Sequence, residues 1–220
     1  MATKTRERLT RARVIDAALR VLDAEGLEAV SMRRVAREVG VEAMSLYNHV
    51  EDKDDLLDGI VARILLEFPV PASDPGRDWA DYGRAVANGW RAVLMAHPHA
   101  LPLLGSRPPA SDDPNVLLPI ETALRALRES GLSEKDAVTA FHAIGGYIFG
   151  FVMMETGQAL GIPGADHKLS GITVDVSAEH LPCLTACMPY LIGCDFDEQF
   201  AFGLDLMIEG LRAKTGAGAA

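Results

Sequence analysis

The chain has 220 residues, of which 49% are hydrophobic, so it is long and apolar enough to bury a substantial core, and extensive disorder is excluded. Its first residues are polar and basic, and no long uninterrupted apolar stretch is evident, so we expect neither a secretory signal nor a membrane span, and a cytoplasmic location. A net charge of −10 argues against nucleic-acid binding by the chain as a whole.

The charge is unevenly distributed along the chain. Residues 1–53 contain ten basic and nine acidic side chains, whereas the remainder contains eleven basic and twenty-two acidic ones. The basic excess is concentrated in the first thirteen residues, where five basic side chains accompany Glu7. This asymmetry indicates an N-terminal module with a basic tip, joined to an acidic body.

Apolar residues recur with a period of about 3.6 along most of the chain, which predicts an all-α fold. The N-terminal module is expected to contain a helix capped by Thr10 and ended by Gly26, a short helix between Ser31 and Gly40, another at 42–49, and one capped by Asp52. After a Pro- and Gly-rich linker at 69–78, we expect helices at 79–97, 99–104, 114–130, 134–160, 181–192 and 196–213.

Three features interrupt this helical pattern. Pro119 and Pro189 fall inside predicted helices and are expected to kink or shorten them, because proline lacks an N–H group and its ring clashes with the preceding turn. Residues 172–176 have strand propensity, but one short strand cannot build a sheet. The predicted fold class therefore stays all-α.

The second and third predicted helices have the spacing of a helix-turn-helix. Ala36, Gly40 and Leu46 lie four and six residues apart. Alanine allows two helices to cross closely, glycine supplies the left-handed conformation of a tight turn, and leucine fills the wedge between the helices. The same spacing occurs by chance in helical proteins, so the neighbouring residues decide its meaning.

Those neighbours are Val30-Ser-Met-Arg-Arg-Val-Ala-Arg-Glu-Val-Gly-Val41, Ser45-Leu-Tyr-Asn-His-Val50, and Lys53 with Asp55-Leu-Leu57. They resemble the DNA-binding domain of the TetR family of bacterial repressors. The acidic half is similar, more weakly, to the tetracycline-repressor branch of that family, for example at Gly105-Ser-Arg-Pro108. The resemblance implies a three-helix DNA-binding domain at residues 1–55 and a helical effector-binding and dimerisation domain at 56–220.

The resemblance also implies which side chains meet DNA. A recognition helix enters the major groove by its N-terminal end, so base edges are expected to face Ala43, Met44 and Ser45. Arg33 is expected at a guanine edge or a phosphate, and the remaining expected contacts are Tyr47, Asn48, His49 and Lys53. Two alternatives stay open: Tyr47 plugs a small core and His49 lies on the surface, and the arm Lys4–Arg13 is either a frayed terminus or a DNA contact.

The family places an effector pocket between its middle helices. The polar ligands of the tetracycline-repressor branch fall here on Pro69, Val86, Leu103, Ala123 and Met154. Because a hard cation needs oxygen or histidine donors, we expect a small, mostly apolar effector instead of magnesium-tetracycline, and no metal or other cofactor. The expected effector-binding residues are Val86, Trp90, Leu103, Arg107, Ile120, Ala123 and Met154, where Arg107 is either a polar anchor or a brace for its loop.

Two predicted helices carry apolar faces suited to dimerisation, which in the family form a four-helix interface. The expected interface residues are Phe149, Phe200, Gly203, Leu204, Met207, Ile208 and Leu211. A homodimer on a near-palindromic operator is therefore expected, and a monomer that buries these faces internally is the alternative. Effector binding in the body is expected to move the helix at 52–68 and release the DNA.

Other chemistry is weakly represented. Cys183, Cys187 and Cys194 crowd into one late segment, where reduced thiols are expected. His180, Cys183 and Cys187 form either a soft-metal site or, as we prefer, a group of small buried residues. No phosphate-binding loop or nucleophile motif is present, so catalysis is not expected.

Two rival functions remain open at this point. An all-α small-molecule-binding protein or enzyme with a vestigial helix-turn-helix predicts no salt-sensitive operator binding. An architectural DNA binder without an effector predicts weak sequence preference, and the net charge of −10 disfavours it.

Overall fold

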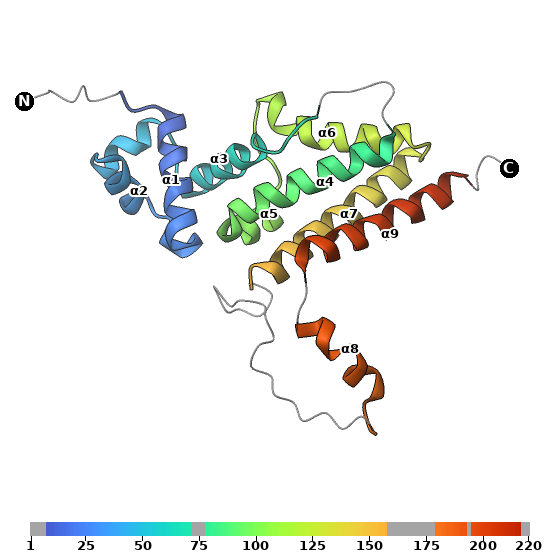
Figure 1. Cartoon of the computed structure of the whole chain (residues 1–220). Coiled ribbons are helices and arrows are strands. Elements are labelled where there is room, and N and C mark those ends of the chain that lie inside the picture. Colours follow the sequence, from blue (N-terminus) through green and yellow to red (C-terminus); the bar gives the residue numbers. More distant parts are fainter. Residues whose placement is uncertain (1–7, 72–77, 158–178, 193–194, 217–220) are drawn as a thin grey trace, which may run out of the picture. The chain divides into compact units, whose positions relative to one another are not determined.

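The computed structural model describes residues 8–71, 78–157, 179–192 and 195–216, and within these ranges every regular element is a helix (Figure 1). The predicted all-α class is confirmed. The chain forms two compact units. The first unit comprises residues 1–73 and 92–123, and the second comprises residues 74–91 and 124–220.

The N-terminal part of the first unit consists of α1 (Arg11–Glu25), η1 (Leu27–Ala29), α2 (Met32–Val39), η2 (Ala43–Asn48) and α3 (Lys53–Leu65). The three predicted N-terminal caps are present, because Thr10, Ser31 and Asp52 each accept a hydrogen bond from the backbone N–H three residues further on. Helix α1 packs against both α2 and α3. Their shared core contains Val14, Leu22, Val35, Leu46, Leu56 and Ile60, all fully buried.

The first unit also contains η3 (Pro98–Ala100), α5 (Leu101–Ser106) and the first turns of α6 (Pro114–Glu129). The predicted helix at 99–104 thus divides into a 3₁₀ turn and a short α-helix. Pro102 is tolerated at the start of α5, where a backbone N–H has no partner within the helix. Helix η3 packs against α1, and α5 packs against α3. Pro119 did not shorten α6, which continues to Glu129.

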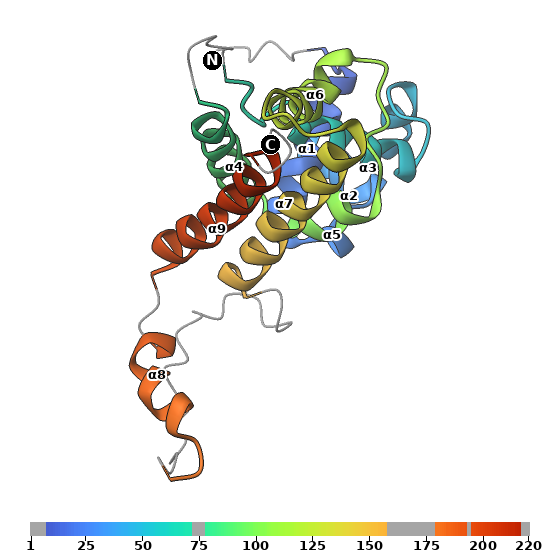
Figure 2. The same ribbon diagram turned by 90° about the vertical axis from the view of Figure 1, so that its right-hand side faces the viewer.

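The second unit contains most of α4 (Trp79–Ala96), α7 (Glu134–Glu155), α8 (Pro182–Ile192) and α9 (Phe196–Gly216). Helices α7 and α9 lie side by side in both views (Figure 1, Figure 2). The Phe200 ring stacks on Tyr147 at 5.4 Å between ring centres. Gly203 allows this close approach, because a Cβ atom there would lie 2.4 Å from the Tyr147 hydroxyl.

Arg91 joins α4 to both of these helices. Its guanidinium donates to Glu155 of α7 at 2.9 and 2.7 Å and to Asp197 of α9 at 2.6 Å. It also lies 4.9 Å from the centre of the Phe200 ring. The Arg91 and Glu155 side chains are only 12% and 13% exposed, and each compensates the charge that the other buries.

Two sequence expectations in this unit are corrected. Helix α7 ends at Glu155 instead of residue 160, because Gly157 adopts a positive φ of 77° that terminates the helix. Cys183 and Cys187 are exposed free thiols on α8, so the predicted burial of these residues is wrong. Among the described residues no group of three metal-ligating side chains is assembled. The segment 172–176, which has strand propensity, and Cys194 lie outside the described residues.

Helix α7 is unusually apolar. An 18-residue window of this 22-residue helix has a mean hydropathy of 1.6, which meets the length and composition of a membrane-crossing helix. Only 28% of the apolar window is buried within the chain. Much of this apolar helix is therefore half-buried or exposed within the chain.

Candidate nucleic-acid interface

The predicted helix-turn-helix is present with the expected geometry. Gly40 follows α2 in the left-handed conformation, with φ 81° and ψ 39°. The backbone N–H groups of Gly40 and Val41 donate to the Ala36 carbonyl at 2.9 and 3.0 Å, which closes the turn. Leu46 is fully buried, and Ala36 is 2% exposed. Each residue of the spacing therefore has the steric role that its side chain predicts.

The reading element after this turn is η2, a 3₁₀ helix. Such a helix has about three residues per turn, so Met44 and Tyr47 share one face. Both side chains are exposed, Met44 by 75% and Tyr47 by 49%, whereas Leu46 points into the core. Tyr47 therefore does not plug the core, and this face is available to a partner. Asn48 is also exposed, and Ala43, Ser45 and His49 are half-buried.

The basic side chains near η2 divide into two groups. Arg34 is held within the module by ion pairs with Glu25 at 2.6 Å and Glu38 at 3.0 Å. Its neighbour Arg33 and the helix-starting Lys53 are exposed, and within the described part of the chain neither forms an ion pair. These two cations are available to meet phosphates, and Lys53 also lies at a helix N-terminus that favours an anion.

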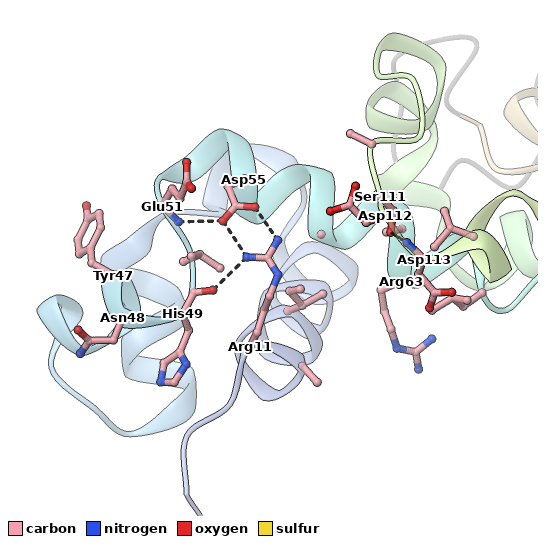
Figure 3. A pocket seen from close by; sticks show the side chains of 18 residues that line it. Arg11, Tyr47, Asn48, His49, Glu51, Asp55, Arg63, Ser111, Asp112 and Asp113 are labelled. Carbon is pink, nitrogen blue, oxygen red and sulfur yellow. Dashed lines mark hydrogen bonds and ion pairs between the residues drawn. The ribbon is translucent and has the colours of Figure 1, made fainter.

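Arg11 clamps η2 to the neighbouring helices. Its guanidinium donates to both carboxylate oxygens of Asp55 at 2.8 and 2.5 Å and to the His49 carbonyl at 3.0 Å (Figure 3). Asp55 also accepts the Glu51 backbone N–H at 2.8 Å. The hydrogen bond from Arg11 holds the pKa of Asp55 below its usual range. One side chain of α1 thereby fixes the end of η2 and the start of α3.

The sequence predicts Arg11 only as part of the basic arm Lys4–Arg13. An arginine that begins one helix and an aspartate near the start of another can form a bidentate pair. However, the two residues are 44 positions apart, and their meeting depends on how α1 crosses α3.

A groove of about 1030 Å³ borders this clamp (Figure 3). One wall carries Arg11, His49 and Asp55, and the other is formed by the loop at 110–113. Apolar residues such as Ile15 and Ala62 also line the groove, together with Gly59. The clamp residues therefore remain accessible to solvent while they hold the module together.

Replacing Arg11 with methionine is expected to lower the free energy of unfolding by about 1–2 kcal/mol, because the Asp55 carboxylate and the His49 carbonyl lose their donors. Chemical denaturation measures this change. The depressed pKa of Asp55 means that the clamp stabilises the fold above about pH 4 and that this contribution disappears as the pH falls through the depressed pKa. The difference between the two proteins should therefore shrink in acid.

The matched control is Arg20→Met on the same helix. Arg20 is 59% exposed and pairs with Glu38 at 3.5 Å, so its replacement should change stability by less than about 0.5 kcal/mol. Equal losses in the two variants would contradict a special role for Arg11.

The structure places the expected effector residues as follows: Val86 and Leu103 are buried, Trp90, Ile120 and Ala123 are half-buried, and Met154 is exposed. Arg107 pairs with Asp54 and Asp58 of α3, at 2.8 Å for the Asp58 contact. This is the bracing role that the sequence left open for Arg107, since its guanidinium is already occupied by two carboxylates.

Part of the predicted dimer face is buried within the chain. Phe200, Leu204 and Ile208 are at most 2% exposed and pack inside their own chain. Gly203 faces Tyr147 of α7, and Phe149, Met207 and Leu211 are half-buried. The outward apolar side chains of α9 are instead Phe202 and Leu206, which are 66% and 61% exposed. Helix α9 has apolar residues on two sides, and its periodicity does not distinguish the inner side from the outer one.

Comparison with known proteins places this architecture in a family. Residues 14–60 match the family of bacterial regulatory proteins named after tetR, and residues 70–215 match the tetracyclin repressor-like C-terminal domain. The chain is 32% identical over 211 residues to the HTH-type transcriptional repressor DrrR1 of Streptomyces coeruleorubidus, covering 92% of this chain and 77% of the relative. It is 29% identical to the class D tetracycline repressor of Escherichia coli, covering 94% and 91%.

The fold is also similar to solved structures. Apo ActR from Streptomyces coelicolor superposes with a TM-score of 0.81 at 31% identity, covering 96% of this chain and 98% of that one. ActR in complex with actinorhodin gives 0.80 at 31% identity, covering 95% and 99%. The chain therefore belongs to the TetR family and is a ligand-responsive, DNA-binding transcriptional regulator.

Proposed function

We propose that this regulator is a repressor that binds a near-palindromic operator as a homodimer and is released by a small, mostly apolar effector. The observation that carries the DNA part is the exposed face of η2 above the buried Leu46 wedge, flanked by two cations without ion pairs in the described chain. We assign the reading domain to residues 1–55 and the effector and dimerisation domain to residues 56–220.

In this proposal the exposed residues of η2 read bases and the cations position the module. Met44 offers an apolar surface to a thymine methyl, and Ser45 offers a hydroxyl. Tyr47, His49 and Lys53 bind phosphates, while Arg33 reaches a guanine edge or a phosphate. Ala43 lies at the start of the element, and Asn48 contacts the backbone or a base. The module is small, so most of its affinity comes from phosphate contacts and depends on salt.

We propose that dimerisation covers the outward faces of α7 and α9. Gly146, Gly150 and Met153 share an exposed strip of α7, because they are spaced four and three residues apart. Phe202 and Leu206 provide an exposed apolar strip on α9, the helix packed against α7. A second copy that covers these strips accounts for the apolar outer surface of α7 in a cytoplasmic protein. The half-buried Phe149, Met207 and Leu211 would border this interface.

The effector class follows from the side chains at the expected lining positions. These are apolar at Val86, Leu103, Ile120, Ala123 and Met154, and Trp90 adds an aromatic surface. None of them supplies the oxygen or nitrogen donors that a hard cation requires. The relative ActR was solved with actinorhodin, which supports an effector other than a magnesium chelate. A thermal-shift screen in which only metal chelates stabilise the protein would reject this assignment.

Coupling to DNA runs through the segment from His97 to Arg107. Leu103 lies in this segment and is buried on α5. At one end, His99 contacts the carbonyls of Leu22 and Asp23 in α1 at 3.1 and 3.0 Å. At the other end, Arg107 holds Asp58 of α3. An effector that displaces α5 would therefore disturb both the His99 contacts with α1 and the Arg107 contact with α3, and these two helices hold η2 in place.

The test is selection of bound sequences from random duplex DNA, followed by fluorescence anisotropy on the selected duplex at several salt concentrations. A repressor of this kind should enrich two inverted half-sites and lose affinity steeply as salt rises. Enrichment of no sequence, with equally weak attraction to every duplex, would instead favour an all-α binding protein or enzyme with a vestigial helix-turn-helix. We assign no catalytic activity to the chain.

A further inference from the structure

A buried histidine lies between two carboxylates at the C-terminal ends of α1 and α3. His97, between α4 and η3, is 8% exposed. Its Nδ1 atom lies 3.0 Å from both carboxylate oxygens of Asp23, in the last turn of α1. Its Nε2 atom lies 3.0 Å from Glu67, just beyond the end of α3. All three residues belong to the first compact unit. One imidazole ring therefore joins the ends of the two helices that carry η2.

This arrangement requires a particular protonation state. A carboxylate only accepts hydrogen bonds, so each ring nitrogen must carry a proton to satisfy its partner. A neutral imidazole has one N–H and one lone pair, and the lone pair would face a carboxylate at 3.0 Å. The two contacts are therefore made together only by the charged ring.

The neighbouring charged and titratable side chains do not replace His97 in either of its two carboxylate contacts. Arg63 binds the other Glu67 oxygen at 2.6 Å and Asp16 at 3.0 Å, so it does not replace the histidine at Glu67 Oε2. The neighbouring His99 meets backbone carbonyls and, among the residues that the structure describes, no carboxylate, and one N–H on Nδ1 satisfies these carbonyls in either charge state. Among the described side chains around this cluster, His97 is the one whose contacts change with its proton.

We propose that His97 is a positioning residue for operator binding, whose protonated ring ties Asp23 of α1 to Glu67 at the end of α3 and whose deprotonation loosens the reading module. This inference rests on the DNA-binding function. In this proposal, protonation of His97 affects DNA binding separately from the effector. Both act on the contacts that hold α1 and α3 around η2.

The direction of the pH dependence follows from the local balance. Burial lowers the pKa of His97, but the hydrogen bonds to Glu67 and Asp23 outweigh it, so the pKa lies above its ordinary value. A raised pKa means that the contact stabilises the folded module fully below about pH 6.5 and that this contribution is lost as the pH rises through the raised pKa. Alkaline conditions should therefore weaken DNA binding.

The experiment compares full-length wild type with His97→Gln, which keeps hydrogen bonding without charge, and His97→Lys, which keeps a charge throughout the tested range. Operator affinity is measured by fluorescence anisotropy at constant ionic strength from about pH 6 to about pH 9. At the acid end, His97→Gln should bind about tenfold more weakly than wild type, as expected for the loss of charge-assisted contacts. This ratio should approach one at the alkaline end. The operator affinity of His97→Lys should show little pH dependence that originates at position 97.

His99→Gln is the matched control, since it removes a histidine of the same segment that faces carbonyls. His49 is unchanged in every variant, so its contribution cancels in the ratio to wild type. NMR titration of the His97 ring in wild type and in Asp23→Asn gives an independent readout. Loss of that carboxylate should lower the ring pKa, whereas a purely packing role would leave it unchanged.

A ratio of wild type to His97→Gln that stays constant across the pH range would overturn the proposal, as would a neutral His97 ring at about pH 6. If thermal unfolding shows the expected pH-dependent difference but operator affinity does not, the positioning role is also rejected. Failure of every protein to bind any selected duplex would instead reject the DNA-binding function, while the NMR titration would still report the charged contact.

Discussion

The double variant Phe202→Glu/Leu206→Glu should be a folded monomer whose affinity for a two-half-site operator is lower than that of wild type by about two to four orders of magnitude. Both side chains are more than 60% exposed within the chain, so charge at these positions disturbs no internal packing. In a dimer, however, the added carboxylates would be buried against the partner's apolar surface without counterions. Each reading module would then have to bind its half-site alone.

Analytical ultracentrifugation gives the oligomeric state, and fluorescence anisotropy on the selected operator gives the affinity. The matched control is Leu117→Glu/Leu118→Glu on α6, which introduces the same charge at residues 45% and 39% exposed. This control should remain dimeric and bind normally. A dimeric Phe202→Glu/Leu206→Glu protein with unchanged affinity would place the interface elsewhere.

Replacing Leu46 with alanine should lower the free energy of unfolding by about 3 kcal/mol. Leu46 is fully buried and fills the wedge between η2 and the helices behind it, and nearby backbone groups close around it: the His49 and Val50 N–H groups donate to its carbonyl at 2.8 and 3.0 Å. Removing the side chain leaves a cavity that this short turn cannot close. Operator binding should fall as well, because the reading element loses its support.

Met44 provides the contrasting variant, two residues away on the opposite face of η2. It is 75% exposed, so Met44→Ala should change stability by less than about 0.5 kcal/mol. It should nevertheless weaken binding to the selected operator by about 1 kcal/mol and relax the base preference at one position. Urea denaturation and competition binding separate the two effects. Comparable loss of stability in both variants would mean that η2 does not present Met44 to a partner.

Much of the reading module was predictable from sequence because its determinants are local. The caps at Thr10, Ser31 and Asp52 each bond a backbone group three residues away, and the turn at Gly40 needs only one residue free to adopt a positive φ. Leu46 follows from the spacing of the motif. Such interactions depend on the order of residues along a short segment, which is why the helix boundaries were nearly right.

The contacts that hold the module were not predictable in the same way. Arg11 and Asp55 are 44 residues apart, and His97 meets an aspartate 74 residues away and a glutamate 30 residues away. Nothing in the local pattern distinguishes these charged residues from those on a solvated face. Their pairing depends on how α1 and α3 cross and on where the segment after α4 docks.

Which side of α9 is buried and which is exposed was likewise decided by tertiary packing. The sequence by itself determined that α9 is a helix with apolar residues on two sides, and that its neighbour α7 is more apolar still. Only packing decided that Phe200, Leu204 and Ile208 are buried, with the Phe200 ring against Tyr147 and Phe151, while Phe202 and Leu206 remain exposed. Periodicity specifies a face, but the side of the helix that is buried depends on the shape and chemistry of its neighbour.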